Sequence, residues 1–221
     1  MQPRADTAAM RSVPCAALGL ALVMALAACS TTAPATRAGT AKAPGAGVAL
    51  QADGGGFQLT EKVRVPADAR ADYDNAMRLM EAGQYAQGIT LLQKVTQKAP
   101  AAAAAYVDLG IAYGRSGDLD HAVASLKRAV EINPRQLVAY NELGMLYRRK
   151  GEFSAARDSY EKALGIFPGF HYARLNLAIL CDVYLADLGC AQENYAAYQR
   201  LVPDDAQVAT WLADLNRRAG H

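Results

Sequence analysis

Hydrophobic and small residues recur along the chain with a period of 34 residues, most clearly between residues 103 and 170. Aligning Pro134 with Pro168 brings two successive copies into register. The other matched positions are Tyr106 with Tyr140, Leu109-Gly110 with Leu143-Gly144, Tyr113 with Tyr147, Gly117 with Gly151, Ala122 with Ala156, Leu126 with Tyr160 and Ala129 with Ala163. A fixed period of this length indicates repeated supersecondary units, each stacked on the next.

Within each copy the spacing predicts two helices that pack against each other. The first helix carries a bulky residue, a Leu-Gly pair three and four residues later and a tyrosine one turn further on, all on one face. Gly110 and Gly144 each cost about 1 kcal/mol of helix propensity, so we expect them where two helices approach closely. The glycine after this helix is expected to end it in a left-handed conformation, and the proline ends the second helix.

The two copies resemble tetratricopeptide repeats, and weaker copies flank them. The first flanking copy has Gly88 where the central copies have alanine. The last one lacks the turn glycine and has one extra residue between Asp182 and Cys190. The resemblance implies an all-α solenoid (domain 68–221) of about four helix-turn-helix repeats, at residues 69–102, 103–136, 137–170 and 171–205.

Helix-capping signals are found at both ends of this domain. Asp68 is a candidate N-cap for the first helix. Asp204 and Gln207 form a capping-box pair at the start of a terminal helix, residues 204–221. Its apolar stripe would cover the last open face of the array, and consists of Val208, Trp211, Leu212 and Leu215.

Residues 1–28 have the pattern of a signal peptide. Arg4 and Arg11 precede an apolar run that is too short for the roughly 20 residues of a membrane-spanning helix. Met10 is a second candidate start. The run ends in Leu-Ala-Ala-Cys, which resembles the processing box of bacterial lipoproteins and implies cleavage before Cys29 and attachment of lipid, such as palmitate, to it. The alternatives are a plain signal cut after Ala28 and an uncleaved anchor.

The same resemblance implies a location. In lipoproteins of this kind, an aspartate after the lipidated cysteine signals retention in the inner membrane, whereas this chain has Ser30. The resemblance therefore implies a lipid anchor in the outer membrane, facing the periplasm.

Two segments connect this anchor to the helices. Residues 29–56 are rich in Ala, Thr, Gly and Pro and predict a flexible tether, because they lack the large apolar residues that offset the entropy of ordering. Residues 57–67 predict an extended strap, since Phe57, Leu59, Val63 and Val65 alternate along it. The strap either lies on the first helices or adds as a strand to the sheet edge of a partner.

Four cysteines are present, and the signal and the lipid account for Cys15 and Cys29. Cys181 and Cys190 flank the altered turn of the fourth repeat, in a compartment that permits oxidation. A disulfide between them would close a short loop. The alternative is two buried thiols that pack as small apolar residues.

Composition and motifs favour binding over catalysis. The chain is 52% hydrophobic and 20% charged, and its net charge of +2 gives no argument for nucleic acid. It has no Gly-x-Ser-x-Gly, no phosphate-binding glycine loop and no His-Glu-x-x-His. Its three histidines are scattered without ligand spacing, so we expect no metal and no cofactor.

The resemblance implies that a ligand lies along the concave face formed by the first helix of each repeat. The repeat register gives an apolar floor with acidic and basic flanks, which suits an amphipathic helix or an extended peptide. The predicted groove residues are Tyr73, Asp74, Met77, Val107, Asp108, Ile111, Arg115, Asn141, Glu142, Met145, Arg148, Arg149, Leu175, Asn176 and Ile179. Some of them would instead pack on neighbouring repeats or on the strap.

The sequence therefore predicts an adaptor of the cell envelope. In this hypothesis the protein, a monomer or small oligomer, binds part of a machine for pilus assembly, secretion, barrel-protein insertion, wall remodelling or energised transport. One alternative is a structural spacer that associates with copies of itself. The other is a cell-wall enzyme, which would need Asp108, Glu142 and the three groove arginines to converge in a cleft.

Overall fold

The computed structural model describes residues 48–53, 56–61 and 63–220. All of them belong to one compact unit, residues 41–221. The predicted signal peptide, the candidate start at Met10, the lipidation site Cys29 and the tether as far as residue 47 lie outside the described residues. Among the helices that are described, each is too short or too polar to cross a membrane.

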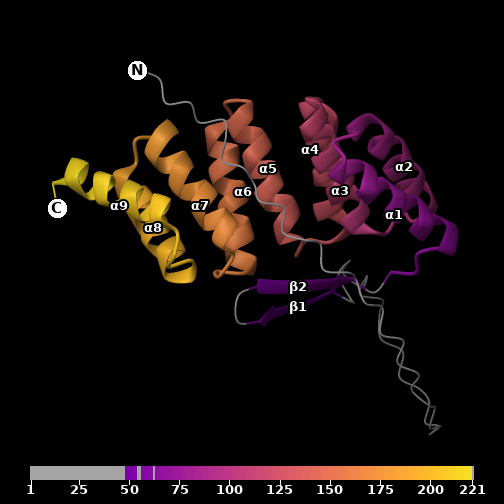
Figure 1. Ribbon diagram of the computed structural model, residues 1–221, viewed down its shortest axis with the longest axis horizontal. Coiled ribbons are helices and arrows are strands. Elements are labelled where there is room, and N and C mark those ends of the chain that lie inside the picture. Colours follow the sequence, from indigo (N-terminus) through magenta and orange to yellow (C-terminus); the bar gives the residue numbers. More distant parts are fainter. Residues whose placement is uncertain (1–47, 54–55, 62, 221) are drawn as a thin grey trace, which may run out of the picture. The chain divides into compact units, whose positions relative to one another are not determined.

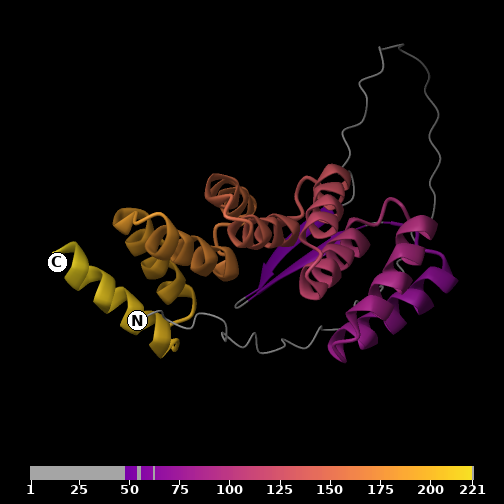
Figure 2. The ribbon, with the colours of Figure 1, turned by 90° about the horizontal axis from the view of Figure 1, so that it is seen from above.

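The described helices form four antiparallel pairs and one final helix, which follow one another in chain order (Figures 1 and 2). This confirms the predicted all-α solenoid of four repeats with a capping helix. The pairs are α1 (Ala67–Glu81) with α2 (Tyr85–Lys98), α3 (Ala103–Ser116) with α4 (Leu119–Ile132), α5 (Leu137–Arg149) with α6 (Phe153–Ile166), and α7 (His171–Ile179) with α8 (Leu188–Leu201). The final helix is α9 (Ala206–Ala219).

The two helices of each central pair approach closely at glycine. A Cβ atom on Gly110 would lie 2.6 Å from Leu126 Cγ, and one on Gly144 would collide with the ring of Tyr160. Gly117 and Gly151 follow the first helices with φ angles of 93° and 77°, which confirms their predicted left-handed conformation.

The fourth repeat is built differently. After α7 the chain continues as a π-helix, η1 (Leu180–Tyr184), which takes up one extra residue without breaking the helix. Ala186 then adopts a φ of 52° in the turn that has lost its glycine. Cys181 and Cys190 form the predicted disulfide across this turn, with their Cα atoms 5.9 Å apart.

The capping signals of the sequence were misplaced at both ends. Helix α9 is capped by Asp205, whose carboxylate accepts hydrogen bonds from the backbone amides of Gln207 and Val208, so the predicted Asp204–Gln207 pair is wrong by one residue. Helix α1 begins after Pro66, and Asp68 lies inside its first turn, where it forms an ion pair with Lys98. The predicted apolar stripe of α9 does pack on the core, since Val208 and Leu215 are buried and Trp211 and Leu212 are half-buried against it.

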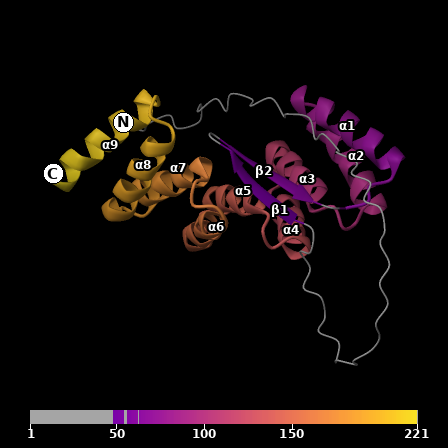
Figure 3. The same ribbon diagram turned by 90° about the horizontal axis from the view of Figure 1, so that it is seen from below.

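A β-hairpin precedes the helices. Strand β1 (Val48–Asp53) pairs antiparallel with β2 (Gly56–Glu61), with Val48 opposite Glu61. The predicted tether therefore ends before residue 48, because β1 gains backbone hydrogen bonds that its small-residue composition did not indicate. In Figures 1 and 3 the hairpin lies along one edge of the helices, near α3 and α5.

The chain from Glu61 to Val65 fixes this hairpin to the repeats. Val63 and Val65 pack on a cluster that joins α2 and α3, as expected of a strap that lies on the first helices. The Glu61 carboxylate accepts hydrogen bonds from the side-chain amides of Asn133 (2.8 Å) and Gln136 (3.3 Å), both buried in the α4–α5 connection. It also accepts one from the backbone amide of Ala104, in the first turn of α3 (3.3 Å).

Candidate functional site

The first helices of the four pairs, α1, α3, α5 and α7, present the face that the repeat register predicted as the binding surface (Figure 3). We call this surface the A face. Helices α3 and α5 contact each other directly, as do α5 and α7. The residues that α3, α5 and α7 contribute therefore form one continuous surface, and the hydrogen bond between Tyr73 and Asp108 joins α1 to it.

Hydrogen bonds join neighbouring repeats across the A face at a constant interval of 35 residues. The Tyr73 hydroxyl donates to Asp108 Oδ2 (2.6 Å), and the Asn176 amide donates to Asn141 Oδ1 (2.9 Å). Near the helix ends, Arg149 donates to the carbonyl of Gly114 (2.9 Å), which is one of the unpaired carbonyls of the last turn of α3. The interval of 35 is one more than the repeat length of 34. Each bond therefore joins a residue of one repeat to the residue that follows the equivalent position in the next repeat.

The apolar residues of the A face are half-buried, apart from Val107. Met77, Ile111 and Met145 pack on the core beneath them while keeping part of their surface accessible. Leu175 and Ile179 do the same on α7. Val107 and Asn141, by contrast, are 5% and 3% exposed, so their predicted place on the groove surface is revised to packing between repeats.

Two carboxylates at equivalent positions are held half-buried on this face. Burial raises the pKa of Asp108 to about 6, although its hydrogen bond from Tyr73 acts in the opposite direction. Burial also raises the pKa of Glu142 to about 6, against the charge of Arg115 and a hydrogen bond from Asn141. The equivalent residue on α1, Asp74, is exposed.

The three predicted arginines lie toward the ends of the helices and have partners there. The Arg148 guanidinium lies over the ring of Tyr184, 5.7 Å from its centroid, and so reaches the end of η1. Arg149 satisfies the carbonyl of Gly114, and Arg115 acts on Glu142. Arg148 and Arg149 therefore help to hold the repeats together at this edge.

One polar atom near this face was missed by the sequence reasoning. Tyr160 extends from α6 across Gly144 of α5, and its hydroxyl is buried without a hydrogen-bond partner among the described residues. Arg148 and Glu142 are among the charged side chains that act on it. Aligning the two central repeats could have indicated this hydroxyl, because Tyr160 takes the position that the apolar Leu126 has in the preceding repeat.

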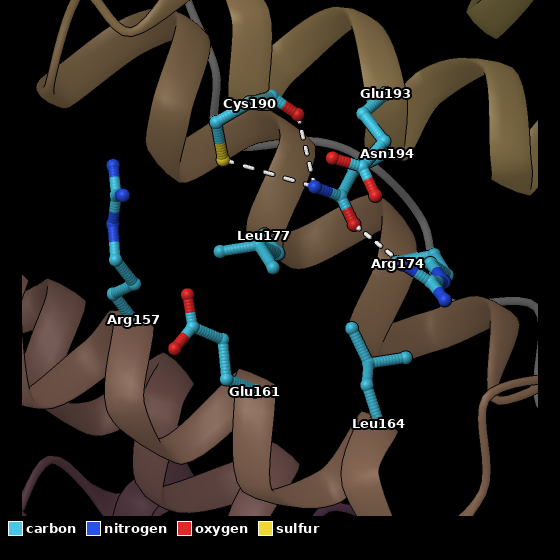
Figure 4. Close-up of a pocket in the computed structure, with 8 residues that line it drawn as sticks. All are labelled: Arg157, Glu161, Leu164, Arg174, Leu177, Cys190, Glu193 and Asn194. Carbon is cyan, nitrogen blue, oxygen red and sulfur yellow. Dashed lines mark hydrogen bonds between the residues drawn. The ribbon is translucent and has the colours of Figure 1, made fainter.

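A cavity of about 320 Å³ lies between α6, α7 and α8, away from the predicted residues (Figure 4). Arg174 donates to Asn194 Oδ1 there (3.1 Å), and Arg157 at its edge donates to Asp187 (2.8 Å). The cavity is lined by Arg157, Glu161, Leu164, Arg174, Leu177, Cys190, Glu193 and Asn194. Because it contains neither Asp108 nor Glu142, it does not bring together the residues that an enzyme was expected to use.

The two cysteines of the fourth repeat are oxidised to a disulfide and are not free thiols. The sulfurs of Cys181 and Cys190 and a carboxylate oxygen of Asp187 lie within 4.8 Å of one another, a spacing that could hold a metal ion. The two sulfurs are joined in the disulfide, however, and offer no thiolate.

Comparison with known proteins agrees with the repeat pattern. The profile of the family described as tetratricopeptide repeat matches residues 73–136, 107–170 and 141–181. A search of curated proteins found no match to the sequence.

Several solved structures share the fold. MamA residues 41–end from Desulfovibrio magneticus RS-1 has a TM-score of 0.63 at 17% identity, over 71% of this chain and 88% of MamA. TTC0263, a TPR protein of Thermus thermophilus, has a TM-score of 0.59 at 24% identity, over 68% and 82%. The first TPR of Spaghetti (RPAP3), bound to the HSP90 peptide SRMEEVD, has a TM-score of 0.51 at 18% identity, over 54% and 94%.

Proposed function

The chain belongs to the tetratricopeptide repeat family, and on that premise we propose that it is a lipid-anchored adaptor on the periplasmic face of the outer membrane. In this proposal the A face binds a peptide or a helix of a partner protein and so supports the assembly of an envelope machine. Proteins of this family mediate protein–protein interactions, and the fold is shared with a domain that is bound to a peptide.

The observation that carries the proposal is the half-buried apolar row on the A face. Met77, Ile111 and Met145 repeat at the interval of the solenoid and are followed by Ile179 on α7. Unbranched methionine side chains adapt to the shape of an apolar ligand. Polar side chains border the row, as expected of a surface that also fixes the orientation of its ligand.

The mode of binding differs from that of TPR domains that grip a C-terminal carboxylate. Those domains carry a lysine and asparagine clamp on their first helices. Here Val107 and Ile111 occupy these positions in one repeat, and Asn141 and Met145 in the next. We therefore assign an internal segment of the partner, rather than a free carboxyl terminus, to the A face.

The test of partner binding is affinity purification from detergent-solubilised envelopes through a C-terminal tag. Met145→Asp places a charge in the apolar row and should remove the partner from the purified material. The matched control is Leu201→Asp, because Leu201 is 46% exposed on α8 and lies outside the A face. Equal recovery of the partner with both variants, each shown to be folded by circular dichroism, contradicts the proposal.

The anchor is tested separately. Cys29→Ser removes the thiol that would carry the lipid, so the variant should lose labelling by an alkyne analogue of palmitate and leave the outer-membrane fraction. Ser30→Asp keeps the thiol and should shift the protein to the inner membrane. A Cys29→Ser protein that stays in the outer membrane would contradict the lipid anchor but leave the A face assignment standing.

A further inference from the structure

The A face contains two half-buried carboxylates that have no cation of their own among the described residues. Neither Asp108 nor Glu142 forms an ion pair within 4 Å of its oxygens with any residue in the described part of the chain. The Tyr73 hydroxyl hydrogen-bonds to Asp108, and the Asn141 amide lies 3.4 Å from Glu142. Both of these partners are neutral.

Several acidic side chains elsewhere in the described part of the chain form ion pairs. Asp182, whose side chain is 12% exposed, is paired with Arg218 at 2.7 Å. Asp187 is paired with Arg157, and even the exposed Asp120 is paired with Lys150.

Glu61 and Asp205 are also half-buried and lack a cation, but each accepts three hydrogen bonds. Asp108 accepts one from Tyr73, and Glu142 a long one from Asn141. Because a charge that leaves water is normally compensated, the two acids of the A face are the least compensated of the half-buried acids described.

The arginines nearby do not fill this role. Arg149 is hydrogen-bonded to the Gly114 carbonyl and Arg148 lies over the Tyr184 ring. Arg115 lowers the pKa of Glu142 through its charge. Arg148 and Arg149 also have neutral partners, but they lie in the last turn of α5, whereas Asp108 and Glu142 lie inside α3 and α5, beside the apolar row. The charge next to the apolar row is therefore negative, which favours a cationic ligand over an anionic one there.

The Tyr160 hydroxyl is a further polar group of this region without a compensating partner. It is buried, it has no hydrogen-bond partner among the described residues, and Glu142 is one of the charged groups that act on it. Tyr160 is 0% exposed, so a ligand on the A face would not touch this hydroxyl directly.

We propose that the partner segment places lysine or arginine side chains against Asp108 and Glu142, while its apolar side chains cover the methionine and isoleucine row. This inference rests on the proposed function, because it specifies the ligand of the same face. Packed helices lie about 8–10 Å apart. Basic residues about three positions apart in an extended segment, or about seven apart in a helix, would therefore reach both carboxylates.

The inference is tested by selecting peptides from a random 15-residue display library on the immobilised full chain. We expect peptides selected by the wild-type protein to be rich in Lys and Arg. The Asp108→Asn/Glu142→Gln double variant should lose that enrichment. The matched control is Asp158→Asn, an exposed acid on α6, which should keep it. Basic enrichment that is absent, or that persists in the double variant, overturns the inference.

Affinity measurements on the most enriched peptide complete the test. Replacing its basic residues with glutamine should weaken binding to the wild-type chain at least tenfold, and should have little further effect on the double variant. Binding to the wild type should also weaken as the pH falls below 6, when protons neutralise the two carboxylates beside Tyr73, Arg115 and Tyr160. Additive losses from peptide and protein changes contradict direct contact.

The outcomes separate this inference from the proposed function. Selected peptides that depend on Met145, tested by Met145→Asp, but not on the two acids, leave the adaptor proposal intact and refute the cationic ligand. A selection that gives the same peptides with the wild-type and Met145→Asp chains refutes binding on the A face itself, and the cationic ligand with it.

Discussion

The second and third repeats differ from the fourth in how each holds its two helices together. In the central repeats, Gly110 and Gly144 let the helices approach until a neighbouring side chain lies against the backbone, and a glycine in the left-handed conformation makes the turn. The fourth repeat has Ala178 in place of the close-approach glycine, a π-helix, a left-handed Ala186 and a disulfide. Where the repeated pattern is lost, a covalent bond constrains the turn.

The two regions also differ in their electrostatics. Asp108 and Glu142 stand on the A face of the central repeats, whereas the equivalent residue on α7 is the neutral Asn176. The central repeats thus combine tight, purely noncovalent packing with uncompensated charge. The fourth repeat carries a cross-link and pairs its half-buried acids, Asp182 and Asp187, with Arg218 and Arg157.

The largest effect is expected from filling the close approach of the third repeat. Gly144→Val would drive its side chain into the Tyr160 ring, and overpacking of this kind should destabilise the fold by about 3 kcal/mol in urea unfolding. Gly165→Ala is the matched control, because Gly165 is helical and nothing lies within 4 Å of its added Cβ. The control should gain about 0.5–1 kcal/mol. A tolerated Gly144→Val would refute the packing argument.

Removing the disulfide should have a slightly smaller effect, confined to the other region. The bond joins residues nine apart, and its loss should cost about 2.5 kcal/mol on the chain-entropy account. Hydrogen exchange with and without a reducing agent should show faster exchange in η1 and α8, with α3 to α6 unchanged. Uniform loss of protection across all repeats would show that the array unfolds as one unit, which contradicts a local effect of the disulfide.

Neutralising the acids of the A face should stabilise the central repeats by about 1–2 kcal/mol at pH 8. The folded pKa of Asp108, about 6, lies above the ordinary value of 3.8, so its contribution favours the fold below pH 4 and is lost as the pH rises through 6. Asp108→Asn should therefore gain stability over the wild type at pH 8, and the gain should shrink by pH 5. Chemical denaturation at the two pH values measures this, and a pH-independent difference contradicts the assigned cause.

The smallest effect concerns the anchor of the hairpin on the central repeats. Glu61→Ala leaves the buried amides of Asn133 and Gln136 without their acceptor, which should cost about 1 kcal/mol. The matched control is Glu131→Ala, since Glu131 is exposed and forms only a surface ion pair with Arg128. The melting temperatures of the two variants measure this difference. Equal melting temperatures would show that the Glu61 hydrogen bonds contribute nothing to the stability of the fold.

Much of the fold could be predicted because the repeat is a local pattern. The pairing of Pro134 with Pro168 sets the register, and the helix spacing inside one unit then places every helix of the array. The bridge between Cys181 and Cys190 was one of the two alternatives that their positions around an irregular turn allowed. These features depend on residues close together in the sequence.

What could not be predicted depends on partners distant in the sequence or on single-residue geometry. The hairpin needs residues 48–53 to pair with 56–61, and the alternation of Phe57 and Leu59 predicts an extended segment but not its partner or register. Glu61 meets Asn133 and Gln136 more than 70 residues later. On the candidate site, the register placed all fifteen residues on the first helices, but burial of Val107 and Asn141 was decided by contacts with the neighbouring repeats.

The central claim, that the A face binds a partner segment, is tested most directly by photo-crosslinking in intact cells. A photoreactive residue at position 111 stands on the half-buried apolar row of the central repeats, and one at position 201 stands on the exposed surface of α8. The account predicts a discrete cross-linked adduct from position 111 and none from position 201. Adducts from position 201 alone, or the same adducts from both positions, would contradict it.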